Sequence, residues 1–240
     1  MLCNWEQLPA EMQTDAVRPY FDVLRKKQGS LLLKRIFDVV VSALMLLVLL
    51  PVFLVLAVAI KLDSPGPVFY RQVRVTQYGK RFRIFKFRSM VQNADKKGAL
   101  VTVGADSRIT RVGKLIRKCR LDEICQLIDV LRGTMTVVGT RPEVPKYVDS
   151  YTPEMLATLL LPAGVTSMAS ILYKDEDRLL ENAEDVDRTY VEQVLPGKMG
   201  YNLREIEKFS FFGDIKVMFM TVFAVLGKDY STEEEKETVA

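Results

Sequence analysis

The 240-residue sequence contains no histidine and only three cysteines. Without histidine, the chain cannot use Ser-His-Asp or Cys-His catalysis, histidine-ligated metals or a histidine pH switch. Cys3, Cys119 and Cys125 are odd in number and lack C-x-x-C spacing, so they predict neither a disulfide framework nor a zinc site. They favour a reducing setting. Any acid, base or nucleophile must therefore be a carboxylate, Lys, Tyr, Cys or Ser.

Apolar residues make up 49% of the chain and charged residues 27%, with 34 Lys or Arg against 30 Asp or Glu for a net charge of +4. These fractions exclude a disordered tail, a collagen-like chain and a small disulfide scaffold. At roughly 150 residues per domain, the length favours one large domain, or one domain with an appendage, and allows a sizeable core.

The longest apolar run extends from Val39 to Ile60 and contains 22 residues without a charge. A straight helix of this length reaches about 33 Å, enough to cross the hydrocarbon core of a bilayer. Pro51 sits near the middle of the run, where it removes a backbone hydrogen bond and favours a kink. Basic residues cluster on both sides, so both ends favour the cytoplasmic face. A re-entrant helix that enters one leaflet and returns is therefore favoured over a straight span.

The segment before this run predicts a short amphipathic element. Residues 9–27 have helical composition with a basic end, interrupted at Pro19, which is typical of a segment lying on lipid headgroups. Gly29–Ser30 marks a joint before the membrane helix. Lys34 and Asp38 are one helical turn apart, and this spacing predicts an ion pair at the interface.

The chain after the apolar run predicts a hairpin followed by helices. Residues 68–75 and 77–90 predict two strands around a turn at Gln77–Lys80. Residues 107–131 predict two helices, the second beginning near Leu121.

Further helices are expected in the last part of the chain. Gly133 has the position of a helix C-terminal glycine, and residues 153–160 and 205–226 are also helical in composition. Within the last of these, residues 217–227 carry no charge but are too few to span a bilayer. We therefore expect a helix there that is buried or lies at the membrane interface.

Asp122 and Glu123 are adjacent acids preceded by Arg117, Lys118 and Arg120. At a helix N-terminus, the dipole and these cations keep both carboxylates ionised, which suits a nucleophile or a ligand for a hard cation such as Mg²⁺. Adjacent acids in a first helical turn are also ordinary stabilisation of a helix end. The pair alone does not decide between the two interpretations.

Basic and aromatic residues alternate between Lys80 and Arg88. On a strand, Lys86 and Arg88 share a face with Ile84. Such interleaving is typical of single-stranded nucleic-acid binding, but the nearby membrane run favours anionic headgroups or a diphosphate-bearing substrate. A solvated basic face is the alternative. Further along, Arg141 lies between a Gly-Thr turn and a proline, which suits contact with an oxyanion or a phosphate.

Several ordered motifs carry a resemblance to a known family. They are KRIFD at 34–38, the apolar run with its central proline, DSPGPVFYRQ at 63–72, FRIFKFRSM at 82–90, RLDEICQLIDVLRG at 120–133 and VVGTRPE at 137–143. Together they resemble the bacterial sugar transferases, the monotopic polyprenyl-phosphate phosphosugar transferases. The similarity continues through 159–176, 194–199 and 214–221.

The resemblance implies a re-entrant membrane helix, a cytoplasmic catalytic domain, and transfer of a sugar 1-phosphate from a UDP-sugar to a polyprenyl phosphate with release of UMP and a requirement for Mg²⁺. By the same resemblance, Asp122 is the nucleophile that forms a phosphosugar intermediate and Glu123 assists, both beside the metal. Arg117 and Arg141 match family arginines suited to phosphate charge. Lys86 and Arg88 complete the expected substrate contacts.

Some positions depart from the common family pattern. Leu50 stands where a serine often precedes the membrane proline, Thr140 replaces a frequent proline, and Thr134 replaces a frequent aspartate. Residues 164–170 also differ from the common sequence. These changes lie outside the acid pair and indicate a sub-branch difference, which leaves the identity of the sugar, rather than the reaction, undetermined.

The predicted fold is α+β, with a re-entrant membrane helix, a mostly helical cytoplasmic catalytic domain and a small β-hairpin. The expected parts are an N-terminal amphipathic segment, the re-entrant helix, the catalytic domain and a disordered acidic tail, at residues 1–30, 31–62, 63–227 and 228–240. We expect an inner-membrane enzyme of capsule, exopolysaccharide or O-antigen initiation that binds no nucleic acid and that can form a homodimer.

Two other functions compete with the transferase interpretation of these residues. A membrane-tethered scaffold that binds anionic lipid or nucleic acid does not need Asp122 and Glu123. A membrane acyltransferase lacks its usual His-Asp pair, because the chain has no histidine.

Overall fold

The computed structural model describes residues 2–92, 94, 106–173, 180, 183 and 185–230. Its α-helices are α1 (Arg18–Lys26), α2 (Gln28–Asp63), α3 (Arg111–Lys118), α4 (Leu127–Arg132), α5 (Pro145–Val148), α6 (Met168–Leu172), α8 (Val186–Thr189), α9 (Leu195–Glu207) and α10 (Phe211–Val225). A π-helical segment, η7 (Tyr190–Val194), joins α8 to α9. Short 3-10 helices are η1 (Trp5–Gln7), η2 (Ala10–Met12), η3 (Gln77–Gly79), η5 (Ile124–Gln126) and η6 (Met155–Leu160). The strands are β1 (Phe69–Val75), β2 (Arg81–Phe87), β3 (Met135–Val138) and β4 (Ala163–Thr166). The predicted α+β class is confirmed.

The predicted hairpin is present as an antiparallel pair of β1 and β2, whose register runs from Phe69 opposite Phe87 to Val75 opposite Arg81. The turn between them contains Tyr78 and Gly79 with positive φ. On β2, Ile84 and Phe87 are buried in two different apolar clusters. The hairpin is therefore fixed from both faces, and its polar side chains are held at defined positions.

A second sheet, formed by β3 and β4 in parallel, was not predicted from the sequence. Its backbones cross very closely just beyond β3, where a Cβ atom on Gly164 would lie 2.1 Å from the carbonyl oxygen of Gly139. No other residue fits at Gly164 without moving the backbone. This close crossing fixes the start of the loop that carries Arg141.

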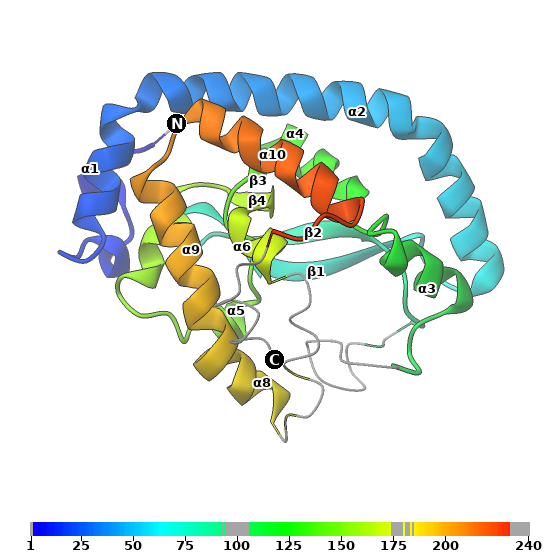
Figure 1. The fold of residues 1–240 in the computed structure, drawn as a ribbon. Helices are drawn as coiled ribbons and strands as arrows, with labels where there is room; N and C mark the ends of the chain where they lie inside the picture. Colours follow the sequence, from blue (N-terminus) through cyan, green and yellow to red (C-terminus); the bar gives the residue numbers. More distant parts are fainter. Residues whose placement is uncertain are drawn as a thin grey trace.

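Helix α2 is one continuous element of 36 residues that includes Pro51. Figure 1 shows it running along one edge of the molecule and bending in its second half toward α3. Among the described residues it alone is long and apolar enough to cross a membrane, and Leu47 and Val48 are more than two-thirds exposed. The helix begins at Gln28, so the joint lies at Lys27 rather than at Gly29–Ser30.

The beginning of α2 is anchored to the rest of the protein by its charged residues. The ammonium group of Lys34 donates to Asp214 at 2.6 Å. Asp38 accepts hydrogen bonds from the Thr136 hydroxyl and, at 3.2 Å, from the Val137 amide. The predicted Lys34–Asp38 pair is therefore wrong, because each group is used in a long-range contact that attaches α2 to β3 and α10.

The far end of α2 is anchored to the same body. The Asp63 carboxylate accepts from the Val112 amide of α3 at 3.0 Å. The guanidinium of Arg88 donates to the carbonyl oxygens of Ser64 at 2.6 Å and Pro65 at 2.9 Å. Both ends of the apolar helix are thus tied to elements that lie next to the hairpin.

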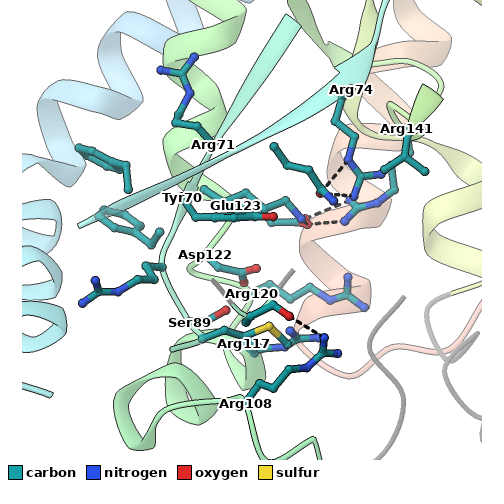
Figure 2. A pocket seen from close by; sticks show the side chains of 18 of the residues that line it. Tyr70, Arg71, Arg74, Ser89, Arg108, Arg117, Arg120, Asp122, Glu123 and Arg141 are labelled. Atoms are coloured by element: carbon teal, nitrogen blue, oxygen red, sulfur yellow. Dashed lines mark hydrogen bonds and ion pairs between the residues drawn. The ribbon is translucent and has the colours of Figure 1, made fainter. Parts of the chain in front are cut away.

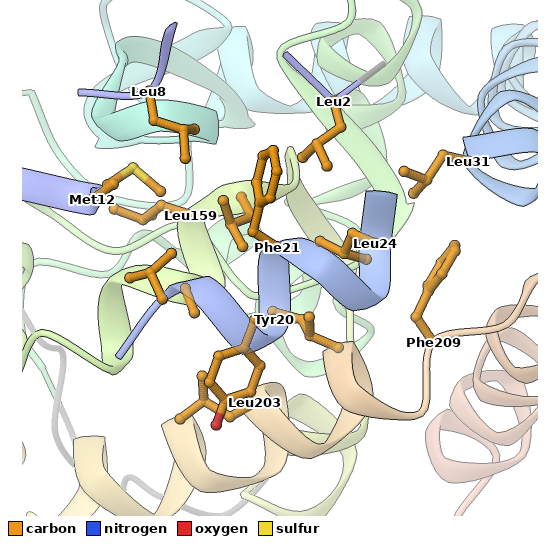
Figure 3. Packing of buried hydrophobic residues seen from close by; sticks show 14 of the residues in the cluster. Leu2, Leu8, Met12, Tyr20, Phe21, Leu24, Leu31, Leu159, Leu203 and Phe209 are labelled. Carbon is orange, nitrogen blue, oxygen red and sulfur yellow. The ribbon is translucent and has the colours of Figure 1, made fainter. Parts of the chain in front are cut away.

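The N-terminal segment belongs to a large apolar core. Tyr20, Phe21 and Leu24 of α1 are buried against η6 and the end of α9, as Figure 3 shows. Pro19 lies in the first turn of α1, where its fixed φ starts the helix rather than interrupting it. The expected apolar face for lipid headgroups is therefore already covered by protein.

The C-terminal helix predicted at 205–226 is two helices. Helix α9 ends at Glu207 and α10 begins at Phe211, with Ser210 accepting from the Gly213 amide as an N-cap. Figure 1 shows α10 beside α2, and no residue of α10 is buried. The expectation that 217–227 is buried is therefore wrong, and its position at a membrane interface stays a prediction. The expected tail at 228–240 lies, from 231 onward, outside the described residues.

Candidate active site

A cavity of about 990 Å³ opens between the hairpin, α3, the loop after β3 and the start of α9. Three carboxylates line it, those of Asp122, Glu123 and Glu143. Eleven basic side chains also line it: Arg71, Arg74, Arg83, Lys86, Arg88, Arg108, Arg117, Lys118, Arg120, Arg141 and Lys198. This excess of positive charge suits a ligand with several negative charges.

The acid pair lies in a turn that follows α3. The helix ends with Arg120 in the left-handed region at φ 52°, and the amides of Arg120 and Leu121 donate back to the carbonyls of Arg117 and Ile116. This is a Schellman arrangement, with arginine at the position that glycine normally occupies. The reversal turns the chain sharply, so that Leu121 packs in an apolar cluster and Asp122 lines the cavity.

Asp122 is fixed by its backbone while its side chain faces the cavity, as Figure 2 shows. Its carbonyl accepts from the Phe87 amide at the end of β2, at 2.9 Å. Within the part of the chain that the structure describes, its carboxylate forms no ion pair. Burial and the neighbouring Glu123 raise the pKa of Asp122, while Lys86 and Arg117 oppose the rise. The Asp122 side chain is therefore held in a defined position, and its carboxylate is not neutralised by an ion pair with a described residue.

Glu123 has the opposite environment. One of its oxygens accepts from Lys86 at 3.0 Å, and both oxygens accept from the guanidinium of Arg141. Although burial alone raises the pKa of a carboxyl, Arg141 and Lys86 hold the pKa of Glu123 well below its usual range. Glu123 stays ionised and brings two cations together beside Asp122.

All six predicted site residues line the cavity, but Arg88 differs from the other five in its hydrogen-bond partners. Asp122, Glu123, Lys86 and Arg141 form one cluster, and Arg117 lines the same cavity from α3. The predicted helix N-terminus at the acid pair is a turn that leads into the short η5. The favourable charge comes from side chains rather than from a long helix.

Arg88 lies differently from the other predicted residues. Strand β2 ends at Phe87, and the Arg88 side chain is buried against the end of α2, where it bonds to carbonyl oxygens. Its guanidinium thus contacts the backbone at the end of α2. The structure favours a structural role for Arg88, and its assignment as a substrate ligand stays a prediction.

The cavity lining also includes residues that were not predicted as site residues, among them Arg74, Glu143, Tyr190 and Lys198. Glu143 follows the Arg-Pro pair and was visible as part of a motif. Tyr190 and Lys198 lie some fifty residues further on; Lys198 falls within the matching segment 194–199, whereas no local pattern marks Tyr190. Only the packing of η7 and α9 against the loop brings them to the cavity.

The expected Mg²⁺ site can be tested against these groups. Among the described residues no cluster of three or more Asp, Glu, Cys or His side chains is formed. Glu123 has both oxygens on cations, which leaves Asp122 as the available carboxylate. The residues fit a cation that takes one protein carboxylate and completes its shell with phosphate oxygens and water, as Mg²⁺ commonly does.

Residues 29–228 match the bacterial sugar transferase family. The chain therefore belongs to this family. The match covers α2, the hairpin, the acid pair and α10, and leaves out α1.

Three relatives are similar over most of the chain. It is 35% identical over 220 residues to a UDP-N-acetylgalactosamine-undecaprenyl-phosphate N-acetylgalactosaminephosphotransferase of Aeromonas hydrophila, covering 87% of this chain and 49% of that protein. It is 36% and 34% identical to UDP-glucose:undecaprenyl-phosphate glucose-1-phosphate transferases of Escherichia coli and Caulobacter vibrioides, covering 80% and 82% of this chain and 40% and 70% of theirs. The chain thus spans less than half the length of the Aeromonas and Escherichia proteins.

Proposed function

We propose that the protein transfers a sugar 1-phosphate from a UDP-sugar to undecaprenyl phosphate, releasing UMP and starting a lipid-linked glycan for capsule, exopolysaccharide or O-antigen. The observation that carries the proposal is the Asp122 carboxylate, which forms no ion pair with a described residue in a cavity lined by eleven basic side chains. The names of the relatives supply the substrate classes.

The proposed chemistry has two steps at one phosphorus atom. An oxygen of the Asp122 carboxylate attacks the sugar-bearing phosphorus of the UDP-sugar, and the bond from that phosphorus to the bridging oxygen breaks, so that UMP leaves with this oxygen. In the second step, an oxygen of undecaprenyl phosphate attacks the same phosphorus and the bond to Asp122 breaks. The carboxylate is thereby restored.

The surrounding charges account for how this chain promotes such a reaction. Phosphoryl transfer depends mainly on positioning and on neutralising phosphate charge. Glu123 holds Lys86 and Arg141 together beside Asp122, and Arg117 faces the same cavity. In this role Glu123 assists by placing cations rather than by attacking phosphorus. A Mg²⁺ ion held by Asp122 and the substrate phosphates would supply further charge neutralisation.

We further propose that α2 is re-entrant and that the catalytic domain lies on the cytoplasmic face. The contacts of Lys34 and Asp38 at one end, and of Asp63 and Arg88 at the other, all lead to one folded body. A helix that crossed the bilayer would place its ends on opposite sides and break one set of contacts. The basic residues on both flanks favour the cytoplasmic side.

The proposal is tested by incubating purified protein with undecaprenyl phosphate, Mg²⁺ and a panel of UDP-sugars while UMP release is measured. We expect release with one or a few sugars, dependent on the lipid for multiple turnovers, and loss of release in Asp122→Asn. A protein that binds lipid vesicles but releases no UMP from any UDP-sugar would contradict the proposal.

A further inference from the structure

The wall of the cavity behind Arg141 is built around one buried carboxylate, that of Glu143, which is 5% exposed. The hydroxyl of Tyr190 donates to it at 2.6 Å. The ammonium group of Lys198 lies 3.7 Å from the same oxygen and donates to the Tyr190 hydroxyl at 3.0 Å. A buried charge is tolerated only when it is paired and hydrogen-bonded, and Glu143 satisfies both conditions.

The two partners of Glu143 come from a helix with an unusual turn. Over eight residues a regular α-helix rotates by about 800°, which would leave Tyr190 and Lys198 about 80° apart around the axis. The π-helical segment from Tyr190 to Val194 has wider turns, so the rotation is smaller and the two side chains meet. Such segments are frequent at functional sites.

On its other side, Glu143 lies next to Arg74, and it follows Arg141 by two residues in the chain. Its backbone carbonyl accepts from the Val75 amide at 3.0 Å. Arg74 places its guanidinium 3.9 Å from the second Glu143 oxygen and donates to the Pro142 carbonyl at 3.0 Å. Arg74 and the loop that carries Arg141 are therefore held together next to this one carboxylate.

We propose that Glu143, held by Tyr190 and Lys198, is a positioning residue that sets Arg74 and Arg141 for a diphosphate. This inference rests on the proposed function, because it assigns the two arginines to the phosphates of the donor. Its role is exerted through the arginines, and the effect is on recognition of phosphate rather than of the nucleoside.

The test uses two buried tyrosines whose rings are 4.7 Å apart. Tyr190→Phe removes the hydrogen bond to Glu143 without changing any charge. Tyr147→Phe is the matched control, because the Tyr147 hydroxyl donates to Asp187 instead, at 2.5 Å. Binding of UDP and of uridine to the detergent-solubilised 240-residue chain is measured by calorimetry, so no turnover is required.

We expect Tyr190→Phe to raise the Kd of UDP on the order of tenfold, as the loss of one strong buried hydrogen bond implies, and to leave that of uridine unchanged. For Tyr147→Phe, the Kd of each ligand should stay within about twofold of the wild-type value. The melting temperatures of Tyr147→Phe and Tyr190→Phe should fall by similar amounts, because each variant loses one buried hydrogen bond. Equal effects of the two variants on UDP, or a parallel loss of uridine binding, would overturn the inference.

A second variant disrupts the same hydrogen-bond network without changing Tyr190. Glu143→Asp keeps the charge but shortens the side chain, so it cannot reach Tyr190, Lys198 and Arg74 together. We expect weaker UDP binding and no further loss when it is combined with Tyr190→Phe, because the two changes break one network. Additive losses would contradict the inference. UMP release by the wild type is measured separately and decides the proposed function.

Discussion

Two adjacent carboxylates, those of Asp122 and Glu123, differ in what surrounds them, and this difference supports the different roles proposed for them. Both oxygens of Glu123 accept from Lys86 or Arg141, and its pKa is held well below the usual range. Asp122 makes no ion pair with a described residue, and burial together with Glu123 raises its pKa. A group that attacks phosphorus must be accessible, while a group that organises cations must stay ionised. The geometry fits Asp122 to the first role and Glu123 to the second.

These pKa directions give the pH dependence of the first step. Asp122 attacks only when ionised, and its raised pKa means that ionisation is lost at a higher pH than for an ordinary aspartate. As the pH is lowered, the rate of single-turnover UMP release without lipid should therefore begin to fall at a pH above the usual aspartate range. The pH profile should have the slope expected for the protonation of one group. Glu123 adds no second limb, because its pKa is low.

The matched variants for this profile lie on one helix. Arg117 lowers the pKa of Asp122, so Arg117→Gln should move the acid limb to higher pH. Lys114→Gln, on the exposed side of α3, should leave the limb in place. An acid limb that does not move in Arg117→Gln would show that Asp122 is not the group being titrated.

At the scale of elements, Lys86 in β2 and Arg88 just after it have different partners. Lys86 contacts Glu123 in the cavity, whereas Arg88 contacts the backbone at the end of α2. Lys86→Ala should weaken use of the UDP-sugar on the order of 1.5–3 kcal/mol with little change in melting temperature. Arg88→Ala should destabilise the fold by a similar amount, because it removes a buried guanidinium that bonds to the end of α2. Thermal unfolding and donor kinetics of the two variants are compared. Normal stability with weak donor use in Arg88→Ala would restore Arg88 as a substrate ligand.

The anchoring of both ends of α2 predicts its topology. Cysteines introduced singly at the exposed positions Lys26 and Lys61, in a background without the three native cysteines, should react equally with an impermeant thiol reagent. Inverted membrane vesicles expose the cytoplasmic side, and both should be labelled there. Labelling of one position in inverted vesicles and of the other only from the opposite side would exclude the re-entrant arrangement.

What the sequence could predict at this scale was local. Alternation and a Tyr-Gly turn marked the hairpin, and the charge-free run marked α2. The parallel pair of β3 and β4 was missed because each strand has four residues and the partners lie far apart in the chain. Arg88 was placed on the face of Lys86 because the alternating pattern continues past Phe87, where the strand itself ends.

At the scale of the whole molecule, the candidate site is assembled from distant parts. The acid pair, Lys86 and Arg141 lie in the motifs that carry the family resemblance, and Arg117 lies just before one of them, so the sequence could point to all five. Tyr190 and Lys198 reach the cavity because η7 and α9 pack against the loop after β3, and the sequence does not show this packing. The charged side chains proposed to bind phosphate were therefore predictable, whereas the contacts of Glu143 with Tyr190 and Lys198 were not.

The central claim, that Asp122 forms a covalent phosphosugar intermediate, is tested most directly by mass spectrometry of the protein mixed with its UDP-sugar and Mg²⁺ in the absence of lipid. We predict a mass increase of one sugar phosphate, mapped to Asp122, with one UMP released per protein, and no such adduct in Asp122→Asn. A preparation that transfers sugar phosphate to lipid but never carries the adduct would contradict the claim and indicate direct attack by the lipid phosphate.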